Sequence, residues 1–306
     1  MASHSIRTSA HTLEAPAKIN LSLHVEGRRS DGYHELRGLV AFADIGDELH
    51  LQKPGPDQSG QWSLQCKGPF AAQLAGASNN PDDNLVIRAA ALYAKRASCE
   101  LSGLFTLTKN LPIASGIGGG SSDAAAALRL LQNFNPNPLS TRELARLAME
   151  IGADVPMCLT PKAQLIAGRG EVLWPLRDFP ALPAVLVNPR VPVSTKTVFE
   201  TLSAPQLVDH FKPKQPALPK PRTPSAMISY LHEQRNDLQA PALKAAPVIS
   251  KILKILANDK NCDLARMSGS GATCFGLYES EEIAGKAASS IADEHREWWV
   301  AATVLL

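Results

Sequence analysis

The sequence predicts a protein that combines helices with an antiparallel or mixed β-sheet, and three observations lead to this fold class. Apolar and polar residues alternate from Lys18 to Val25, as they do in a strand. Further strand-like segments follow in short succession, which favours antiparallel or mixed pairing. Segments of helical composition, the first at 85–97, lie between them. The length of 306 residues allows two domains or one large one.

The amino-acid composition indicates which binding partners and which cellular compartment to expect. The formal net charge is +2, so neither a nucleic acid nor a membrane is expected as a partner. The five cysteines are scattered and form no C-x-x-C pair, which indicates a reducing, cytoplasmic environment. Residues 1–14 lack the apolar core of a signal peptide and are expected to form a loose tail. The oligomeric state stays open.

In the N-terminal half, strands are expected over 18–25, 39–43, 48–51, 62–66 and 104–108. The first is expected to be half-buried, with Lys18, Asn20, Ser22 and His24 on its polar face. The Asn-rich break at 79–84 can cap a helix over 85–97. A capping box at Ser140 and Glu143 begins another helix, and Gly152 ends it.

In the C-terminal half, strands are expected over 163–167 and 184–188, then a hairpin of 264–267 with 273–278, and a last strand over 298–305. Helices are expected over 236–257, interrupted by prolines, and over 281–295. Residues 212–224 contain five prolines and several basic residues, so they are expected to form an exposed excursion.

The glycine-rich stretch from Leu111 to Ala126 is the central candidate site. It connects a strand to a helix, and four of its five positions 116–120 are glycine. Glycines let backbone N–H groups approach a ligand, and the helix start adds partial positive charge, so the stretch predicts a phosphate site. Ser121 and Ser122 can cap this helix. The alternative is a flexible linker. Two common phosphate loops do not fit, because a Walker loop requires a Lys that is lacking here and a dinucleotide-binding loop requires glycine at the position of Ser121.

Two charged residues are candidates for catalysis. Asp154 lies between apolar residues just after a helix end, where it can act as a base or simply form a turn with its own backbone. Lys18 begins the first strand, where it can stabilise a developing alkoxide or simply be solvated.

Two further motifs have alternatives of their own. Tyr33 and His34 can stack on and hydrogen-bond a planar ring, or form an ordinary pair at a loop end. The turn Ser268–Ala272 can be a second phosphate nest or a tight hairpin turn.

Four motifs in this order resemble the GHMP kinase superfamily, which contains galactokinase and the homoserine, mevalonate and phosphomevalonate kinases. They are Pro16–Asn20, Gly116–Ser122, Gly152–Pro156 and Ser268–Ala272. Three more are similar to members that act on a cytidine diphosphate substrate: Asp31–His34, Asn84–Ala90 and Arg235–Leu238. Each motif alone is weak, but the ordered set from residue 16 to about 278 is specific.

This resemblance implies a two-domain α+β GHMP kinase fold with the active site in the inter-domain cleft. The tail 1–14 would precede an N-terminal domain over 15–162, with the ATP-phosphate loop and the catalytic residues, and a C-terminal domain over 163–306. The implied reaction transfers the γ-phosphoryl of ATP, with Mg²⁺, to the 2-hydroxyl of a methylerythritol that carries cytidine diphosphate. This is a step of the non-mevalonate route to isoprenoid precursors.

The resemblance also implies roles for single residues. The residues expected to wrap the ATP phosphates are Pro112, Ile113, Ala114, Ser115, Gly116, Ile117, Gly118, Gly119, Gly120, Ser121 and Ser122. Asp154 would take the proton from the substrate hydroxyl, Lys18 would orient and polarise that hydroxyl, and Asn20 would contact the substrate near its reacting end. Tyr33 and His34 would receive the cytosine ring, with Phe199 as a candidate for the opposite face. No protein ligand of Mg²⁺ is assigned.

Two alternatives to this function remain. The first is another small-molecule kinase of the same superfamily, which would accept homoserine or mevalonate instead. The second is a nucleotide-responsive binding protein without turnover, for which a base such as Asp154 would serve no purpose.

Overall fold

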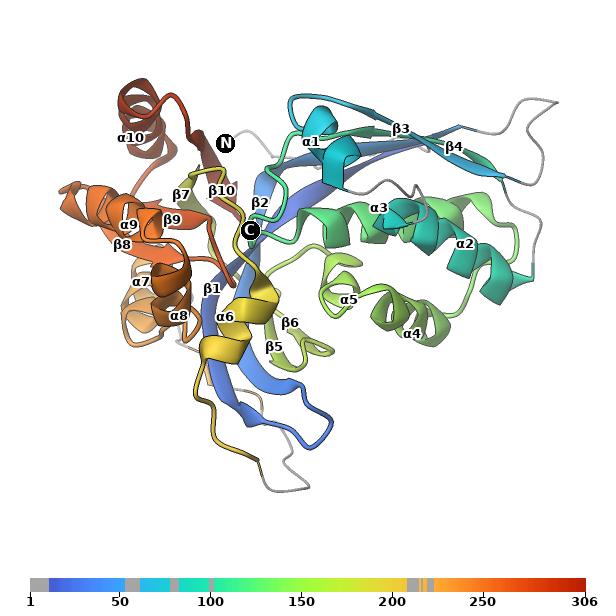
Figure 1. Ribbon diagram of the computed structural model, residues 1–306, viewed down its shortest axis with the longest axis horizontal. Coiled ribbons are helices and arrows are strands. Elements are labelled where there is room, and N and C mark those ends of the chain that lie inside the picture. Colours follow the sequence, from blue (N-terminus) through green and yellow to red (C-terminus); the bar gives the residue numbers. More distant parts are fainter. Residues whose placement is uncertain are drawn as a thin grey trace. The chain divides into compact units, whose positions relative to one another are not determined.

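The computed structural model describes residues 11–52, 61–77, 83–98, 102–207, 215, 217–218 and 223–306 (Figure 1). Most of the predicted tail, residues 79–82 of the Asn-rich break and most of the predicted excursion at 212–224 lie outside these residues.

The described strands are β1 (Thr12–Arg28), β2 (His34–Gln52), β3 (Trp62–Lys67), β4 (Gly103–Thr108), β5 (Gln164–Gly168), β6 (Val172–Pro175), β7 (Leu182–Asn188), β8 (Cys262–Met267), β9 (Cys274–Tyr278) and β10 (Trp299–Leu305). The described helices are α1 (Ala71–Ala77), α2 (Leu85–Ala97), α3 (Gly119–Phe134), α4 (Thr141–Ile151), α5 (Val155–Cys158), α6 (Thr195–Thr201), α7 (Pro224–His232), α8 (Gln239–Ala245), α9 (Val248–Asn258) and α10 (Glu281–Glu294).

The chain forms two compact units. Unit 1 comprises Met1–Ala17, Ile45–Ile113 and Gly118–Pro161, and unit 2 comprises Lys18–Asp44, Ala114–Ile117 and Lys162–Leu306. Strands β1 and β2 each contain residues of both units. The glycine-rich stretch is divided as well, because residues 114–117 belong to unit 2 and the residues on either side belong to unit 1.

Unit 1 packs helices against a small mixed sheet. The end of β2 runs antiparallel to β4, with Glu48 opposite Thr108, whereas β3 runs parallel to β4. Helices α2 and α3 lie beside these strands, and α4 and α5 pack against α3 (Figure 1). The core consists of apolar side chains from both layers, among them Leu49, Phe105, Leu107, Val86, Tyr93, Leu128 and Leu131.

Unit 2 is built on antiparallel strands in the order β10, β7, β9 and β8. The first part of β2 pairs with β5 in the same unit, with Leu36 opposite Gly168. Helices α9 and α10 pack on the sheet, α9 against β8 and β9, and α10 against β7 and β10 (Figure 1).

Most predicted elements are confirmed, including the helix over 85–97. Asn84 caps it by accepting a hydrogen bond from the Val86 N–H at 2.9 Å. The capping box at Ser140 and Glu143 is also present at the start of α4. The predicted hairpin is confirmed as β8 and β9. Five of the described elements were not expected from the sequence, namely α1, α5, α6, α7 and β6.

Two expectations about strands are wrong. The segments 39–43 and 48–51 form one strand, β2, because the polar residues between them have partners. Asp44, for example, accepts hydrogen bonds from Thr303 Oγ1 and Val304 N. The first strand is not half-buried, since its polar face is at most 4% exposed at Lys18, Asn20, Ser22 and His24. Both faces of β1 are therefore covered, and its polar side chains bond inside the protein.

Candidate active site

The glycine-rich stretch has the backbone that a phosphate loop requires. Ala114, Gly116 and Gly118 have left-handed φ values of 50°, 75° and 65°. Gly118 is the N-cap of α3 and supplies no side-chain bond to it. The first N–H groups of a helix have no partner within it, and the helix start favours negative charge. The loop therefore presents backbone donors at a positive helix end.

The expected capping by Ser121 and Ser122 is wrong. Helix α3 begins at Gly119, so both serines lie inside its first turns. Ser122 is buried, and its hydroxyl donates to the Pro16 carbonyl at 2.7 Å. A glycine at the left-handed cap leaves the helix start open, where a serine side chain would have covered it.

Residues 114–117 are anchored within unit 2. Thr273 donates two hydrogen bonds to the Ser115 carbonyl, from its N–H at 3.1 Å and from Oγ1 at 2.7 Å. Ser268 Oγ donates to the Gly116 carbonyl at 3.1 Å, and the Lys18 N–H donates to the Ile117 carbonyl at 2.8 Å. Three successive carbonyls of the loop are thus fixed by the fold.

Gly116 lies too close to the turn at 268–271 to carry a side chain. A Cβ there would come within 2.5 Å of the Gly271 carbonyl oxygen. The turn is the tight connection of the β8–β9 hairpin, and it packs against the loop. Within unit 2 the turn thus acts as a support for the loop, while its alternative role as a second phosphate nest stays a prediction.

Lys18 and Asn20 lie together on the polar face of β1. Lys18 Nζ donates to Asn20 Oδ1 at 2.9 Å, and the Asn20 N–H donates to Ser268 Oγ at 3.0 Å. Lys18 is 4% exposed, so the alternative of a solvated edge lysine is excluded. A buried, oriented ammonium can stabilise negative charge that develops on a bound group.

Asp154 immediately precedes the short helix α5 in unit 1. It occupies the N-cap position with φ −86° and ψ −14°, and its side chain does not cap the helix. The residue is half-buried. Lys18 belongs to unit 2, so the two candidate catalytic residues lie in different units.

The predicted ring-binding residues are brought together within unit 2. The His34 and Phe199 rings stack with centroids 4.9 Å apart and planes at 28°. Tyr33 is 55% exposed, and the Arg169 guanidinium lies 4.7 Å from its ring centroid. Burial and the charge of Arg28 lower the pKa of His34, so its imidazole is neutral at neutral pH and has one donor and one acceptor nitrogen.

A buried charged cluster next to the loop was not found from the sequence. Lys109 Nζ donates to Asp47 Oδ2 and, at 2.9 Å, to Asp123 Oδ2. Asp47 Oδ1 also accepts from the N–H groups of Asn110 and Leu111 at 2.6 and 2.9 Å. All three charged side chains are at most 4% exposed. Because Asp47 and Lys109 are 62 residues apart, no local pattern in the sequence indicates the pair.

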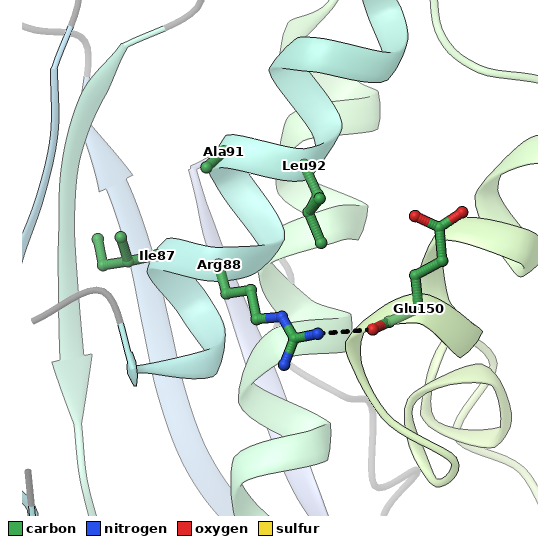
Figure 2. A pocket seen from close by; sticks show the side chains of 5 residues that line it. All are labelled: Ile87, Arg88, Ala91, Leu92 and Glu150. Atoms are coloured by element: carbon green, nitrogen blue, oxygen red, sulfur yellow. Dashed lines mark hydrogen bonds between the residues drawn. The ribbon is translucent and has the colours of Figure 1, made fainter.

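A surface pocket of about 430 Å³ lies between α2 and α4. Figure 2 shows the Arg88 side chain reaching from α2 to the backbone of Glu150, whose carbonyl accepts its hydrogen bond at 2.9 Å. The other lining residues are Ile87, Ala91 and Leu92, and none of the predicted site residues is among them.

Metal and membrane features are both lacking in the described part of the chain. It contains no group of three or more His, Cys, Asp or Glu side chains that could hold a metal ion. None of its helices is long and apolar enough to cross a membrane.

Two family models match the chain. GHMP kinases N terminal domain matches residues 84–162, which contain α2, the glycine-rich stretch and Asp154. GHMP kinases C terminal matches residues 216–297, which contain the β8–β9 hairpin. The matches cover the helices and loops that carry most of the candidate site, and they define the chain as a GHMP kinase in class.

Full-length relatives narrow the class. The chain is 47% identical to "4-diphosphocytidyl-2-C-methyl-D-erythritol kinase" from Methylobacterium radiotolerans, with 95% of this chain and 97% of the relative covered. It is 49% identical to the protein of the same name from Dinoroseobacter shibae, with 95% and 93% covered. A crystal structure of 4-(cytidine 5'-diphospho)-2C-methyl-D-erythritol kinase is 32% identical, with a TM-score of 0.75 and with 96% and 98% covered.

The chain therefore belongs to the 4-diphosphocytidyl-2-C-methyl-D-erythritol kinase family of the GHMP kinases. A homoserine kinase structure from Cytophaga hutchinsonii, at 20% identity and a TM-score of 0.65, shares the fold. The predicted α+β GHMP kinase fold and the resemblance to this superfamily are both confirmed.

Proposed function

We propose that this chain transfers the γ-phosphoryl group of ATP to the 2-hydroxyl of 4-diphosphocytidyl-2-C-methyl-D-erythritol, in the non-mevalonate route to isoprenoid precursors. The observation that carries the proposal is the left-handed Gly118 opening directly into α3. With no side chain capping it, the N-terminus of α3 is open to a phosphate group. The relatives that match nearly the whole chain are named as this kinase, which also supports the proposal.

The nucleotide phosphates bind along residues 112–122. Backbone N–H groups at the start of α3 donate to the phosphate oxygens, and the glycines keep side chains out of their way. The anchored carbonyls of residues 115–117 hold the other part of this loop in place. The backbone of the loop is therefore largely in place before ATP binds, so little conformational entropy is lost on binding.

Asp154 and Lys18 act on the acceptor hydroxyl. Asp154 takes the proton of the 2-hydroxyl while the hydroxyl oxygen attacks the γ-phosphorus of ATP. The bond between this phosphorus and the β-γ bridging oxygen breaks, and ADP leaves. Lys18 polarises the hydroxyl and stabilises the developing negative charge. Asn20 accepts a hydrogen bond from the Lys18 ammonium, which fixes its position, and also contacts the substrate.

Tyr33, His34 and Phe199 recognise the cytidine group. Phe199 covers one face of His34, which leaves the imidazole edge and the exposed Tyr33 ring for the base. Stacking on Tyr33 supplies affinity, and hydrogen bonds to neutral His34 supply the choice of base.

Mg²⁺ is proposed to enter with ATP. The described residues contain no group of three or more His, Cys, Asp or Glu side chains that could hold it, and the Ser122 hydroxyl is already bonded to Pro16. The protein side chains thus fit a cation held mainly by the nucleotide phosphates, where it neutralises their charge. We also propose a cytoplasmic location, with small molecules as partners and neither nucleic acid nor membrane.

An acceptor screen tests this function. The purified chain is given ATP and Mg²⁺ with one acceptor at a time, and ADP release is followed by a coupled assay. ADP release should require the cytidine-containing acceptor, with no release above background for homoserine or mevalonate. Turnover of either of those would identify a different GHMP kinase, and nucleotide binding without turnover of any acceptor would indicate a binding protein.

A further inference from the structure

The buried cluster of Lys109, Asp47 and Asp123 lies directly against the start of α3. A Cβ built on Gly119 would come within 3.1 Å of Lys109 Nζ and 3.6 Å of Asp47 Oδ2. Gly119 is the first residue of α3 and half-buried, so the cluster is one side-chain layer away from the phosphate loop.

The two carboxylates of the cluster have unequal surroundings. Asp47 accepts from Lys109 at one oxygen and from two backbone N–H groups at the other, so both of its oxygens have donors. Asp123 accepts from Lys109 at 2.9 Å and forms a side-chain hydrogen bond with Asp47 when one of the two carboxyl groups is protonated, whereas its buried Oδ1 has no hydrogen-bond partner. An ionised carboxylate seeks donors at both oxygens, whereas an unpartnered oxygen is less costly on a neutral carboxyl group.

The charges of the cluster do not balance if both carboxylates are ionised. One ammonium then faces two negative charges in a site that water does not reach, and buried charge without a counter-charge is costly. Burial raises the pKa of Asp123 to about 8; Lys109 acts to lower it, and Asp47 acts to raise it. One proton on Asp123 makes the cluster neutral.

Few other ionisable groups face Asp123. The Cys66 thiol of β3 interacts with the charges of both Asp123 and Lys109. From α2, the buried side chains are apolar except Tyr93, whose hydroxyl donates to Gln132 two turns further along α3. From α5, Cys158 receives the weak hydrogen bond of Ser122 at 3.4 Å. The buried side chains of α4 are apolar.

We propose that Asp123 is a positioning residue for nucleotide binding, and that a proton on it strengthens the binding of ATP phosphates by the adjacent loop. Protonated, it leaves Lys109 and Asp47 as a neutral pair beneath Gly119. Deprotonated, it adds a negative charge behind the donors that face the phosphates, and this charge repels them. The inference rests on the proposed function of the loop as the phosphate site.

The test measures nucleotide affinity against pH in wild type and Asp123→Asn. Binding of the non-hydrolysable analogue with an imido β–γ bridge, with excess Mg²⁺, is titrated calorimetrically from pH 7 to 9.5. Wild-type affinity should fall by about tenfold across this range, the size expected for one added charge at about 10 Å in a partly shielded site. Asp123→Asn should lose this dependence, because an amide of the same shape does not ionise.

Two matched variants separate Asp123 from other groups. Cys66→Ser removes the neighbouring thiol, and Asp178→Asn changes an exposed aspartate of unit 2. Both should retain the wild-type fall in affinity. A pH dependence in Asp123→Asn equal to that of wild type would overturn the proposal, and so would a wild-type affinity that does not change with pH.

The wild-type protein provides a second readout if Asp123→Asn does not fold. At pH 8.5, titrations in two buffers of different ionisation enthalpy report the protons taken up on binding. Uptake of a sizeable fraction of one proton supports the proposal, and no uptake overturns it. If the analogue does not bind wild type at pH 7, the proposed function itself fails, which is a separate outcome from pH-independent binding.

Discussion

His34 and Phe199 stack on one another, with ring centroids 4.9 Å apart and planes at 28°. The two rings are in direct contact, so Phe199 covers one face of the imidazole. The edge of neutral His34 and the exposed ring of Tyr33 are the parts that we propose to contact the cytidine group. The proposed function divides recognition of the base between Tyr33, which stacks, and His34, which forms hydrogen bonds.

Variants of these two residues should affect the acceptor in different ways. His34→Ala should lose the preference for cytidine over uridine acceptors, because its hydrogen bonds make the choice. Tyr33→Ala should weaken both acceptors alike, by about 1–3 kcal/mol for a lost stacking partner. ATP affinity is the internal control and should not change in either variant. A full cytidine preference in His34→Ala, measured as kcat/KM for both acceptors, would show that the histidine is structural.

Asp154→Asn should separate binding from turnover. The amide keeps the shape of the side chain and cannot take a proton, so kcat should fall by about 10²–10⁴ while ATP still binds. Single-turnover kinetics with a calorimetric control for ATP binding would check this. A near-normal kcat would exclude Asp154 as the base.

Gly119→Ala and Gly120→Ala form a matched pair at the start of α3. A Cβ at Gly119 meets Lys109 Nζ at 3.1 Å, whereas at Gly120 its nearest neighbour is Leu85 Cδ1 at an ordinary 3.5 Å. Gly119→Ala should therefore lower the free energy of unfolding by about 1–3 kcal/mol and also weaken ATP binding. Gly120→Ala should not lower stability, since alanine favours a helix. Urea unfolding compares the two, and equal stability would contradict the close packing at Gly119.

His24 should make the protein less stable in acid. It is 3% exposed, and its Nδ1 has no hydrogen-bond partner among the described residues. Burial lowers its pKa, with Arg37 and Arg235 acting in the same direction. Below about pH 6.5 the unfolded state then binds more protons than the folded state, so stability falls as the pH falls.

Urea unfolding at pH 7, 6 and 5 tests this expectation. His24→Gln should lose less stability than wild type over this range, although His34 leaves part of the effect in place. The exposed His232 serves as a control, and His232→Gln should behave like wild type. An identical loss in His24→Gln and wild type would exclude His24 as a source of acid sensitivity.

Local signals allowed much of the fold to be predicted from the sequence. Asn84 and Ser140 mark helix starts by bonds to residues two and three positions away, and both predictions are confirmed. The burial of β1 could not be predicted, because Asn20 finds its partner Ser268 only 248 residues later. The pairing of Asp47 with Lys109 could not be predicted for the same reason, because the two residues are far apart in the sequence.

The candidate site also contains features that the sequence predicted and features that it did not. The left-handed glycines and the helix start follow from the glycine spacing, and they are present. The serines of the motif were expected to cap the helix, but Gly118 takes that position and Ser122 bonds to Pro16. The catalytic roles of Lys18 and Asp154 stay predictions, because they concern the polarisation and deprotonation of a bound substrate hydroxyl.

Phosphorus NMR of the reaction product tests the central claim most directly. The wild-type chain is incubated with Mg²⁺, 4-diphosphocytidyl-2-C-methyl-D-erythritol and ATP labelled with oxygen-18 in its γ-phosphoryl group, and the product spectrum is recorded over time. The proposed reaction predicts a new phosphomonoester on the 2-hydroxyl that carries the label, formed in step with ADP, and a much slower reaction with Asp154→Asn. Phosphate on another hydroxyl, or label released only as inorganic phosphate, would contradict it.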